Sequence, residues 1–366
     1  MARGINAGGD LLTALADGTD LNKLWQDYSD AVAEYNARRG TIVNLLSFKT
    51  TLSVDAVLQT FTGNDFEDAS EYGEPVGTRP TITQAELGFM FRWRDAATRF
   101  TWQFLADATK EQTDAITNSV MEADSKQVFQ GVMAALFNNT ARTNKEGKAV
   151  LPLWNGDSMV PPDYDGRTFG PTHTHYVTTA NASLTQVSVD ALMELVLEHG
   201  YGQGRNGRLV LLVNRAQANV IRGFRSTASG GSGSFDFIPG AGAPARLTTE
   251  TVVGDTPPAS IGDQPLIGAY GPAWVGENSL IPAGYVLCVS TGGDNSQFNP
   301  VGFREHPTTS LRGLNIVRGR VPDYPLQDAL FVRGFGTGVR HRGAAAVLQV
   351  TASGTYTAPS QFVGVG

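Results

Sequence analysis

The sequence predicts an α+β fold, and three observations support this prediction. Apolar and polar residues alternate with period two over Leu52–Leu58 and again over Leu87–Trp93, which indicates two strands with one buried face each. A stretch of helical periodicity, roughly 30 residues long, follows from about residue 105. The 42 glycines and 18 prolines indicate many turns, as expected for a chain with numerous short strands.

The length and composition bound the class of protein. A chain of 366 residues can bury a sizeable core and ordinarily makes two domains. Its formal net charge of −7 argues against non-specific binding to nucleic acid or to an anionic membrane surface. No stretch approaches about 18 consecutive apolar residues, so no membrane-spanning helix is expected. The single cysteine, Cys288, excludes an internal disulfide and a multi-cysteine zinc site, and the apolar run around it predicts a buried strand.

Residues 1–40 are predicted to form an N-terminal arm. Apolar side chains recur every three or four positions after Asp20, which is suited to cap a helix, and Gly40 ends the run. This stripe comprises Leu21, Leu24, Trp25, Tyr28, Val32 and Tyr35. Because an isolated helix of this length is marginally stable, we expect the arm to lie against another surface. Trp25 and Tyr28 are predicted to contact a neighbouring subunit.

Residues 41–104 are predicted to form a strand pair with an extended loop at about 60–86. The segment from Asn64 to Pro80 has almost no apolar residue that could anchor it to a core. Ordering some 16 such residues costs roughly 16–32 kcal/mol in backbone entropy, so we expect support from outside the chain. This feature points to assembly rather than to catalysis.

Charged residues of the same region predict how a second copy is held. Four acids and a tyrosine lie in the loop, and arginines lie at its end and on the strand that follows. We expect the acids to meet arginines of a neighbouring subunit, because complementary charge fixes orientation. The predicted inter-subunit residues are Glu67, Asp68, Glu71, Tyr72, Glu74, Arg79, Arg92 and Arg94, with Arg99 adding to the basic set.

Residues 105–187 are predicted to contain one long helix followed by an irregular segment. Thr109 and Gln112 fit a capping box, and the apolar stripe runs on to Phe137. A helix of about 30 residues spans roughly 45 Å, which exceeds the ~30 Å of a small domain. Asp124 and Gly131 interrupt the stripe, so a bend is predicted there.

Residues 188–328 are predicted to form an α/β unit. A helix runs from a cap at Ser188 to His199, a buried strand covers Arg208–Val213, and Asn214 caps a second helix. Short strands are predicted at 274–275 and 285–290. The last segment, 329–366, is predicted to supply return strands at 329–332 and 344–350 and a polar tail.

Motifs that could carry chemistry have weak support. The run Gly202–Gly207 matches G-x-G-x-x-G, but it joins a helix to a strand, the reverse of the dinucleotide-binding order. His173 and His175 could hold a metal from one strand face, yet no further His/Cys cluster adjoins them in sequence. Asp163 opens a run like a calcium loop whose later ligand positions are lost. The sequence therefore favours no catalytic, cofactor-binding or metal site.

Five motifs and the order of the segments carry a family resemblance. The motifs are residues 67–75 (Glu-Asp-Ala-Ser-Glu-Tyr-Gly-Glu-Pro), 153–157 (Leu-Trp-Asn-Gly-Asp), 172–176 (Thr-His-Thr-His-Tyr), 299–306 (Asn-Pro-Val-Gly-Phe-Arg-Glu-His) and 334–343 (Gly-Phe-Gly-Thr-Gly-Val-Arg-His-Arg-Gly). Across essentially its whole length the chain resembles the major capsid proteins of tailed bacteriophages with the Hong Kong 97-like fold. It is most similar to capsid subunits of phages that infect actinobacteria.

The resemblance implies a non-enzymatic shell subunit without cofactors that assembles into hexamers and pentamers of an icosahedral head around double-stranded DNA. It implies an N-arm at about 1–40, an extended loop at about 60–86 that lies over a neighbour, and a spine helix in a peripheral domain at 105–187. It also implies an axial domain at about 188–328, after which the last strands, at 329–366, return to the peripheral domain. The implied partners are other copies of the chain, a portal and packaged DNA, with decoration proteins left open and no membrane. Assembly is expected in the bacterial host cytoplasm.

Two departures from the family pattern lead to further expectations. No lysine occurs between Lys49 and Lys110, so the autocatalytic crosslink of some members is not expected. The arm is short, which predicts a separate scaffolding protein. An encapsulin-type nanocompartment shell is the alternative, and a cytosolic dinucleotide enzyme using Gly202–Gly207 is a third hypothesis.

Overall fold

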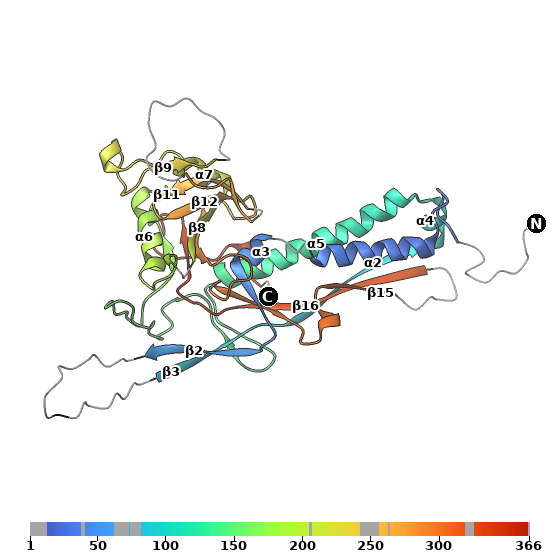
Figure 1. The fold of residues 1–366 in the computed structure, drawn as a ribbon, viewed down its shortest axis with the longest axis horizontal. Helices are drawn as coiled ribbons and strands as arrows, with labels where there is room; N and C mark the ends of the chain where they lie inside the picture. Colours follow the sequence, from blue (N-terminus) through green and yellow to red (C-terminus); the bar gives the residue numbers. More distant parts are fainter. Residues whose placement is uncertain are drawn as a thin grey trace, which may run out of the picture.

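Figure 1 shows the chain as an elongated α+β structure with a ribbon that projects from its body. The computed structural model describes residues 13–37, 41–61, 73, 82–204, 207–241, 256–262, 264–318 and 326–364. Two sheets and one long helix organise these residues.

The long helix is α5 (Lys110–Phe137), whose 28 residues span about 42 Å at about 1.5 Å each. It begins after Thr109, where the Thr109 backbone N–H donates to Gln112 Oε1 at 3.1 Å, as the capping box predicts. The predicted start near residue 105 is wrong, because α4 (Trp102–Asp107) is a separate short helix and Ala108 is extended. Helix α2 (Leu21–Ala37) runs beside α5, and the short α3 (Thr41–Leu46) follows it along the chain (Figure 1).

The two residues that interrupt the stripe of α5 do not break the helix. Asp124 is buried and forms an ion pair with Arg333, whose Nε lies 2.9 Å from Asp124 Oδ1. Gly131 lies where an added Cβ would come 2.9 Å from a ring carbon of Phe335. Helix α5 runs without interruption from 110 to 137, and both residues pack against the five-stranded sheet, while the bend stays a prediction.

A five-stranded sheet lies along α5. Strand β16 (Leu326–Val339) is its hub: its first part pairs with β4 (Arg92–Thr101) and β15 (Leu314–Arg318), and its last part pairs with β14 (Val301–Glu305). Strand β1 (Ser47–Thr50) adds to β14 in parallel. From Phe331 to Val339 the odd positions of β16 face α5 and are buried, including Phe331, Arg333 and Phe335.

The projecting ribbon pairs β2 (Val54–Phe61) with β3 (Ile82–Gly88) and no other strand among the described residues. The predicted strand Leu87–Trp93 is in fact two strands, because the chain leaves β3 at Gly88 and joins the five-stranded sheet at Arg92. Leu87 and Phe89 are buried as predicted, whereas Leu52 and Ala56 are exposed in the single chain. The prediction that this face of the first strand is buried is therefore wrong for an isolated subunit.

An eight-stranded sheet forms the other half of the molecule. Its order is β10-β11-β12-β8-β13-β17-β7, with β9 paired to β11. The bounds are β7 (Tyr176–Thr178), β8 (Arg208–Val213), β9 (Phe237–Pro239), β10 (Ser260–Ile261), β11 (Gln264–Tyr270), β12 (Ala273–Glu277), β13 (Tyr285–Thr291) and β17 (Ala345–Gln349).

This sheet is buried on both faces, which explains why its central strands β8 and β13 carry runs of consecutive apolar residues, 209–213 and 285–289. Leu209 and Leu211 of β8 pack with α6 (Gln186–Leu197) and α7 (Arg215–Ile221), whereas Val210 and Leu212 pack towards the end of α5. Cys288 is fully buried in β13, and burial raises the pKa of its thiol. The predicted strands at 208–213, 285–290 and 344–350 are confirmed.

Smaller elements complete the chain. Residues 142–150 form the hairpin β5 (Arg142–Thr143) and β6 (Ala149–Val150), and short 3-10 turns cover η2 (Thr227–Ser229), η3 (Thr309–Leu311) and η4 (Ser360–Phe362). Thr185 rather than Ser188 caps α6, because Ser188 occupies the third helical position of the capping box. The predicted boundary between the unit at 188–328 and the last segment at 329–366 stays a prediction. Strands that precede this boundary and strands that follow it take part in both the five-stranded and the eight-stranded sheet.

Candidate assembly surfaces

One face of the five-stranded sheet exposes several apolar side chains. From Leu330 onward, the even positions of β16 and the residues paired with them point away from α5, because successive side chains of a strand alternate between faces. Val317, Leu330 and Ala97 are direct neighbours across three strands, and all three are exposed. Val317 is 46% exposed and Leu330 37%, high values for residues in the middle of a sheet. We call this surface, together with Trp93, the outer sheet face.

An aromatic group closes one end of the outer sheet face. Trp93 is 44% exposed and packs edge-to-face on Phe91 with 5.5 Å between ring centroids. His306 lies against both rings, and Arg304 sits 5.4 Å from the Phe91 ring centroid. Gly334 opposes Trp93, and a Cβ there would come 2.7 Å from the indole. This surface was not predicted from the sequence, although the alternation of apolar and polar residues that ends at Trp93 placed that side chain on one face of a strand.

The predicted basic pair lies on the opposite face of the same strand. Arg92 is exposed and Arg94 half-buried, and the Arg94 guanidinium lies 5.5 Å from the Phe335 ring centroid. Burial and the neighbouring Arg92 charge lower the pKa of Arg94. The two arginines therefore share one face, as period-two spacing predicts, but that face turns towards α5.

The N-terminal helix docks on its own chain. The Tyr35 hydroxyl donates to Asp124 Oδ2 at 2.9 Å, and Asn36 exchanges hydrogen bonds with the backbone of Leu314. Burial raises the pKa of Tyr35 to about 12. Thus α2 lies against α5 and β15, which supplies the surface that the sequence required.

The two predicted contact residues of the arm differ in accessibility. Tyr28 is 4% exposed and packs among Leu24, Phe100 and Leu105 of its own subunit. Trp25 is only half-buried beside it, edge-to-face at 6.1 Å between centroids. In this arrangement Tyr28 contributes to the fold of its own subunit, and only Trp25 offers surface to a partner.

Polar contacts fix the base of the β2–β3 ribbon to the body. Arg340 forms an ion pair with Asp55, and Lys148 forms one with Glu86. The Asn144 side-chain amide donates to the carbonyls of Ser53 at 2.9 Å and Phe89 at 3.3 Å. The direction of the ribbon is therefore set by its own subunit. Glu67, Asp68, Glu71, Tyr72, Glu74 and Arg79 lie outside the described residues, as does the side chain of Arg99.

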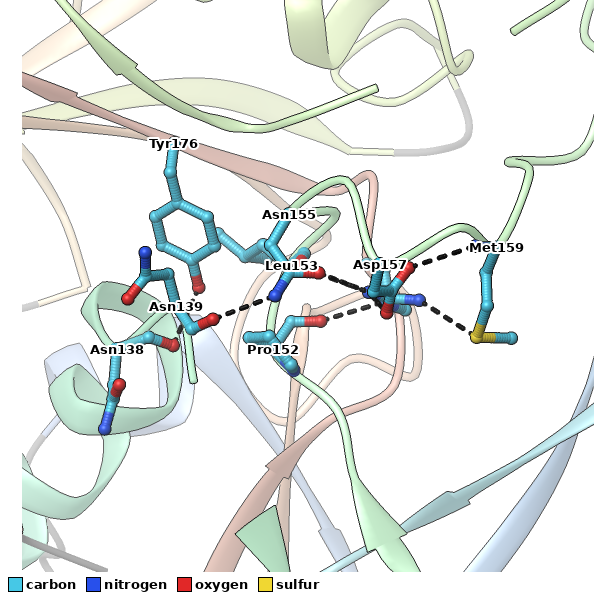
Figure 2. A network of polar contacts seen from close by, with 9 residues as sticks. Asn138, Asn139, Pro152, Leu153, Asn155, Asp157, Met159 and Tyr176 are labelled. Atoms are coloured by element: carbon cyan, nitrogen blue, oxygen red, sulfur yellow. Dashed lines mark hydrogen bonds and ion pairs between the residues drawn. The ribbon is translucent and has the colours of Figure 1, made fainter. Parts of the chain in front are cut away.

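The motif at 153–157 is explained by a buried arginine. Arg342 Nε donates to the Pro152 carbonyl at 2.8 Å, its Nη2 lies 2.6 Å from Asp157 Oδ2, and its guanidinium stacks 4.0 Å from the Trp154 ring centroid. Figure 2 shows the surrounding network, in which Asn155 donates to Asn139 and Tyr176 to Asn138. These contacts tie the irregular segment to the end of α5 and to the second sheet.

The three motifs that the sequence offered as cofactor or metal sites have different structures. The run at Gly202–Gly207 joins α6 to β8, the reverse of the strand-to-helix order that dinucleotide binding requires. The described part of Asp163–Arg167 is a tight turn, with Tyr164 and Arg167 paired through their backbones. His173 and His175 meet His199, a neighbour that the sequence analysis did not consider.

A search of the described helices finds none with the length and apolarity that crossing a bilayer requires. The chain matches no family model, and it matches no curated protein. It is 37% identical to a solved structure from Mycobacterium phage Patience, covering 99% of this chain and 97% of that one with a TM-score of 0.75.

The chain belongs to the major capsid proteins of tailed bacteriophages. A mature capsid of bacteriophage PhiM1 shares the fold at 7% identity and a TM-score of 0.52, covering 85% of this chain and 87% of that one. The resemblance to the Hong Kong 97-like capsid fold is confirmed, and this major capsid protein is a structural component of the virion. An encapsulin complex from Synechococcus elongatus PCC 7942 is 14% identical with a TM-score of 0.44, covering 86% and 89%, which is too weak to argue from.

Proposed function

We propose that this major capsid protein is a non-enzymatic subunit that builds an icosahedral head of hexamers and pentamers around double-stranded DNA. The outer sheet face carries the proposal: a single chain leaves Trp93, Val317 and Leu330 exposed in one sheet. Large exposed apolar side chains gathered on one face in this way are typical of interaction sites in soluble proteins. Many modest contacts of this type, repeated around a closed shell, are made strong by multiplicity.

The projecting ribbon supports the same proposal. It leaves the body as a pair of strands with no third strand beside it among the described residues, and two-stranded ribbons are marginal alone. We propose that a neighbouring subunit holds the loop at about 60–86, with Glu67, Asp68, Glu71 and Glu74 meeting arginines such as Arg79 and Arg92. Tyr72 and Trp25 add apolar area to these contacts.

The proposed partners extend beyond other copies of the chain. They are a separate scaffolding protein, a portal and packaged DNA held without sequence-specific contacts, and assembly takes place in the host cytoplasm. The net charge of −7 supports loose contact with the genome, because a shell of negative subunits does not grip phosphate non-specifically.

The experiment compares particle formation by wild type and by the double variant Glu71→Lys/Glu74→Lys. Size-exclusion chromatography and negative-stain microscopy should show closed particles for wild type and folded, unassembled subunits for the variant. Asp294→Lys, an exposed charge reversal on a turn of the body, is the control and should assemble. Normal particles from the double variant would contradict the loop contact, and a wild-type chain that stays monomeric would contradict the function.

A further inference from the structure

Three histidines from two separate segments converge on one point. His173 and His175 lie just before β7, and His199 lies two residues beyond the end of α6. His173 Nε2 is 3.1 Å from His175 Nε2 and 3.0 Å from His199 Nε2. One ligand atom from each of the three residues lies within 4.8 Å of the other two.

Hydrogen bonding fixes the tautomer of the most buried member. His175 Nδ1 lies 2.6 Å from the carbonyl oxygen of Ala345, so Nδ1 carries the hydrogen and donates it. The Nε2 lone pair of His175 is therefore free to face His173 Nε2. A backbone carbonyl that orients an imidazole in this way is a recurring feature of metal-binding histidines.

No assignment of hydrogens satisfies the whole group. A hydrogen on His173 Nε2 can point to His175 or to His199, and the ring nitrogen that carries it has no lone pair left for the other. Two nitrogens thus compete for one hydrogen at the point where the rings meet. A cation at that point accepts all three lone pairs together.

A carboxylate with an unused oxygen adjoins the histidines. Glu198 Oε1 is buried, lies 3.6 Å from His173 Nε2 and has no hydrogen-bond partner among the described residues. The other oxygen, Oε2, lies 3.6 Å from Arg167 Nη1. Burial raises the pKa of Glu198, as expected for a carboxylate that lacks a close partner.

The surroundings hold the imidazoles in place. Phe169 stacks on His199 with 4.2 Å between ring centroids and 23° between planes, and it also packs on His173. Gly343 backs the opposite side, where an added Cβ would come 3.0 Å from His199 Cγ. Burial lowers the pKa of all three histidines.

We propose that His173, His175 and His199 bind a divalent transition-metal ion of the zinc type through their Nε2 atoms, with the Glu198 carboxylate at the fourth position. Nitrogen ligands at about 2.0–2.1 Å from a tetrahedral zinc lie about 3.3 Å apart, close to the 3.0 and 3.1 Å found here. Imidazole ligands favour zinc, nickel, copper or cobalt over calcium and magnesium, which take oxygen ligands.

The bound ion would be a structural staple. It would join the segment before β7 to the C-terminal end of α6. Arg167 makes a similar link, because its Nη1 lies 2.6 Å from Glu194 Oε1 of α6. Three protein nitrogens and one carboxylate fill a tetrahedral site, as in structural rather than catalytic zinc centres.

The test measures metal in assembled particles of the full chain. Particles are stripped with a chelator, dialysed against a small excess of zinc chloride, washed, and analysed by inductively coupled plasma mass spectrometry. Wild type should retain about one zinc per subunit. His173→Gln and His199→Gln should lose most of it, at least about tenfold in affinity, the loss typical of a changed ligand sphere.

His341→Gln is the matched control, because it removes a half-buried histidine that is not among the three clustered residues and should retain the metal. Cobalt(II) loaded into stripped wild-type particles gives a second readout that needs no variant, since a tetrahedral nitrogen site produces intense visible absorption. Absence of that absorption in wild type, or zinc retention by His173→Gln and His199→Gln equal to that of His341→Gln, would overturn the proposal and leave a neutral hydrogen-bonded cluster.

Discussion

The two sheets of this capsid protein are covered in opposite ways. The eight-stranded sheet is enclosed by its own chain, with α6 and α7 on one face and the end of α5 on the other. The five-stranded sheet has α5 and α2 on one face only, and its other face presents Trp93, Val317 and Leu330. One sheet is therefore complete in a single subunit, and the other is suited to be completed by a second copy.

The difference lies in side-chain pattern rather than in strand pairing. Strand β8 is apolar on both faces, which suits a strand covered twice. In strand β16, Leu330 and Val332 point outward and are more exposed than Phe331 and Arg333, which face α5 and are buried. In a subunit that must stay dissolved before assembly and then associate, one half can carry the stability and the other the contacts.

The largest effect is expected where the open sheet meets α5. Asp124→Ala leaves Arg333 buried without its ion pair and should lower the free energy of unfolding by about 3–5 kcal/mol. Denaturant titration of unassembled subunits measures it. The double variant Asp124→Leu/Arg333→Leu should recover most of the loss. If both variants are equally unstable, the lost side-chain volume rather than the unpaired charge causes the loss of unfolding free energy.

A cavity in the closed sheet is expected to have the next largest effect. Leu211→Ala removes a fully buried side chain of β8 that packs with α6. It should lower the free energy of unfolding by about 2–5 kcal/mol in the same titration. Val187→Ala, at a position 62% exposed on α6, is the control and should change little. A loss below about 1 kcal/mol for Leu211→Ala would contradict the assignment of stability to this half.

A pH effect is expected at the junction of the two sheets. Burial lowers the pKa of His341 from 6.5 to about 4, so below pH 6.5 the unfolded chain takes up a proton that the folded chain does not. This contribution is complete above pH 6.5 and is lost as the pH falls towards 4, by up to about 1.4 kcal/mol per pH unit. His341→Gln should flatten the pH profile of unfolding over that range, and an unchanged profile would assign the pH dependence to other groups.

The smallest effect on folding is expected on the outer sheet face. Val317→Thr with Leu330→Thr keeps strand-forming side chains and should change subunit stability by less than about 1 kcal/mol. Particle yield by negative-stain microscopy should nevertheless fall severalfold. Val220→Thr, at a position 43% exposed on α7, is the control, and equal particle yields from all three proteins would mean that this face has no partner.

Local sequence signals predicted the regular elements well. The helix stripe after Asp20, the capping box at Thr109 and the strand at 208–213 all occur in the structure, because short-range periodicity and capping decide them. Failures came where distant contacts overrode the pattern. The strand expected at Leu87–Trp93 is divided because the chain passes there from one sheet to another. Asp124 interrupts the apolar stripe of α5 because it forms an ion pair with Arg333 of β16.

The sequence by itself determined the α+β class, the long helix, the polar loop and, through its motifs, the capsid resemblance, since each depends on residues close together in the chain. Only the tertiary structure decided which sheet face stays exposed and that Tyr28 is buried in its own subunit. It alone brought His199 to His173 and His175 across 24 or more positions. The physical reason is that burial and ligand geometry depend on neighbours in space, which chain periodicity does not specify.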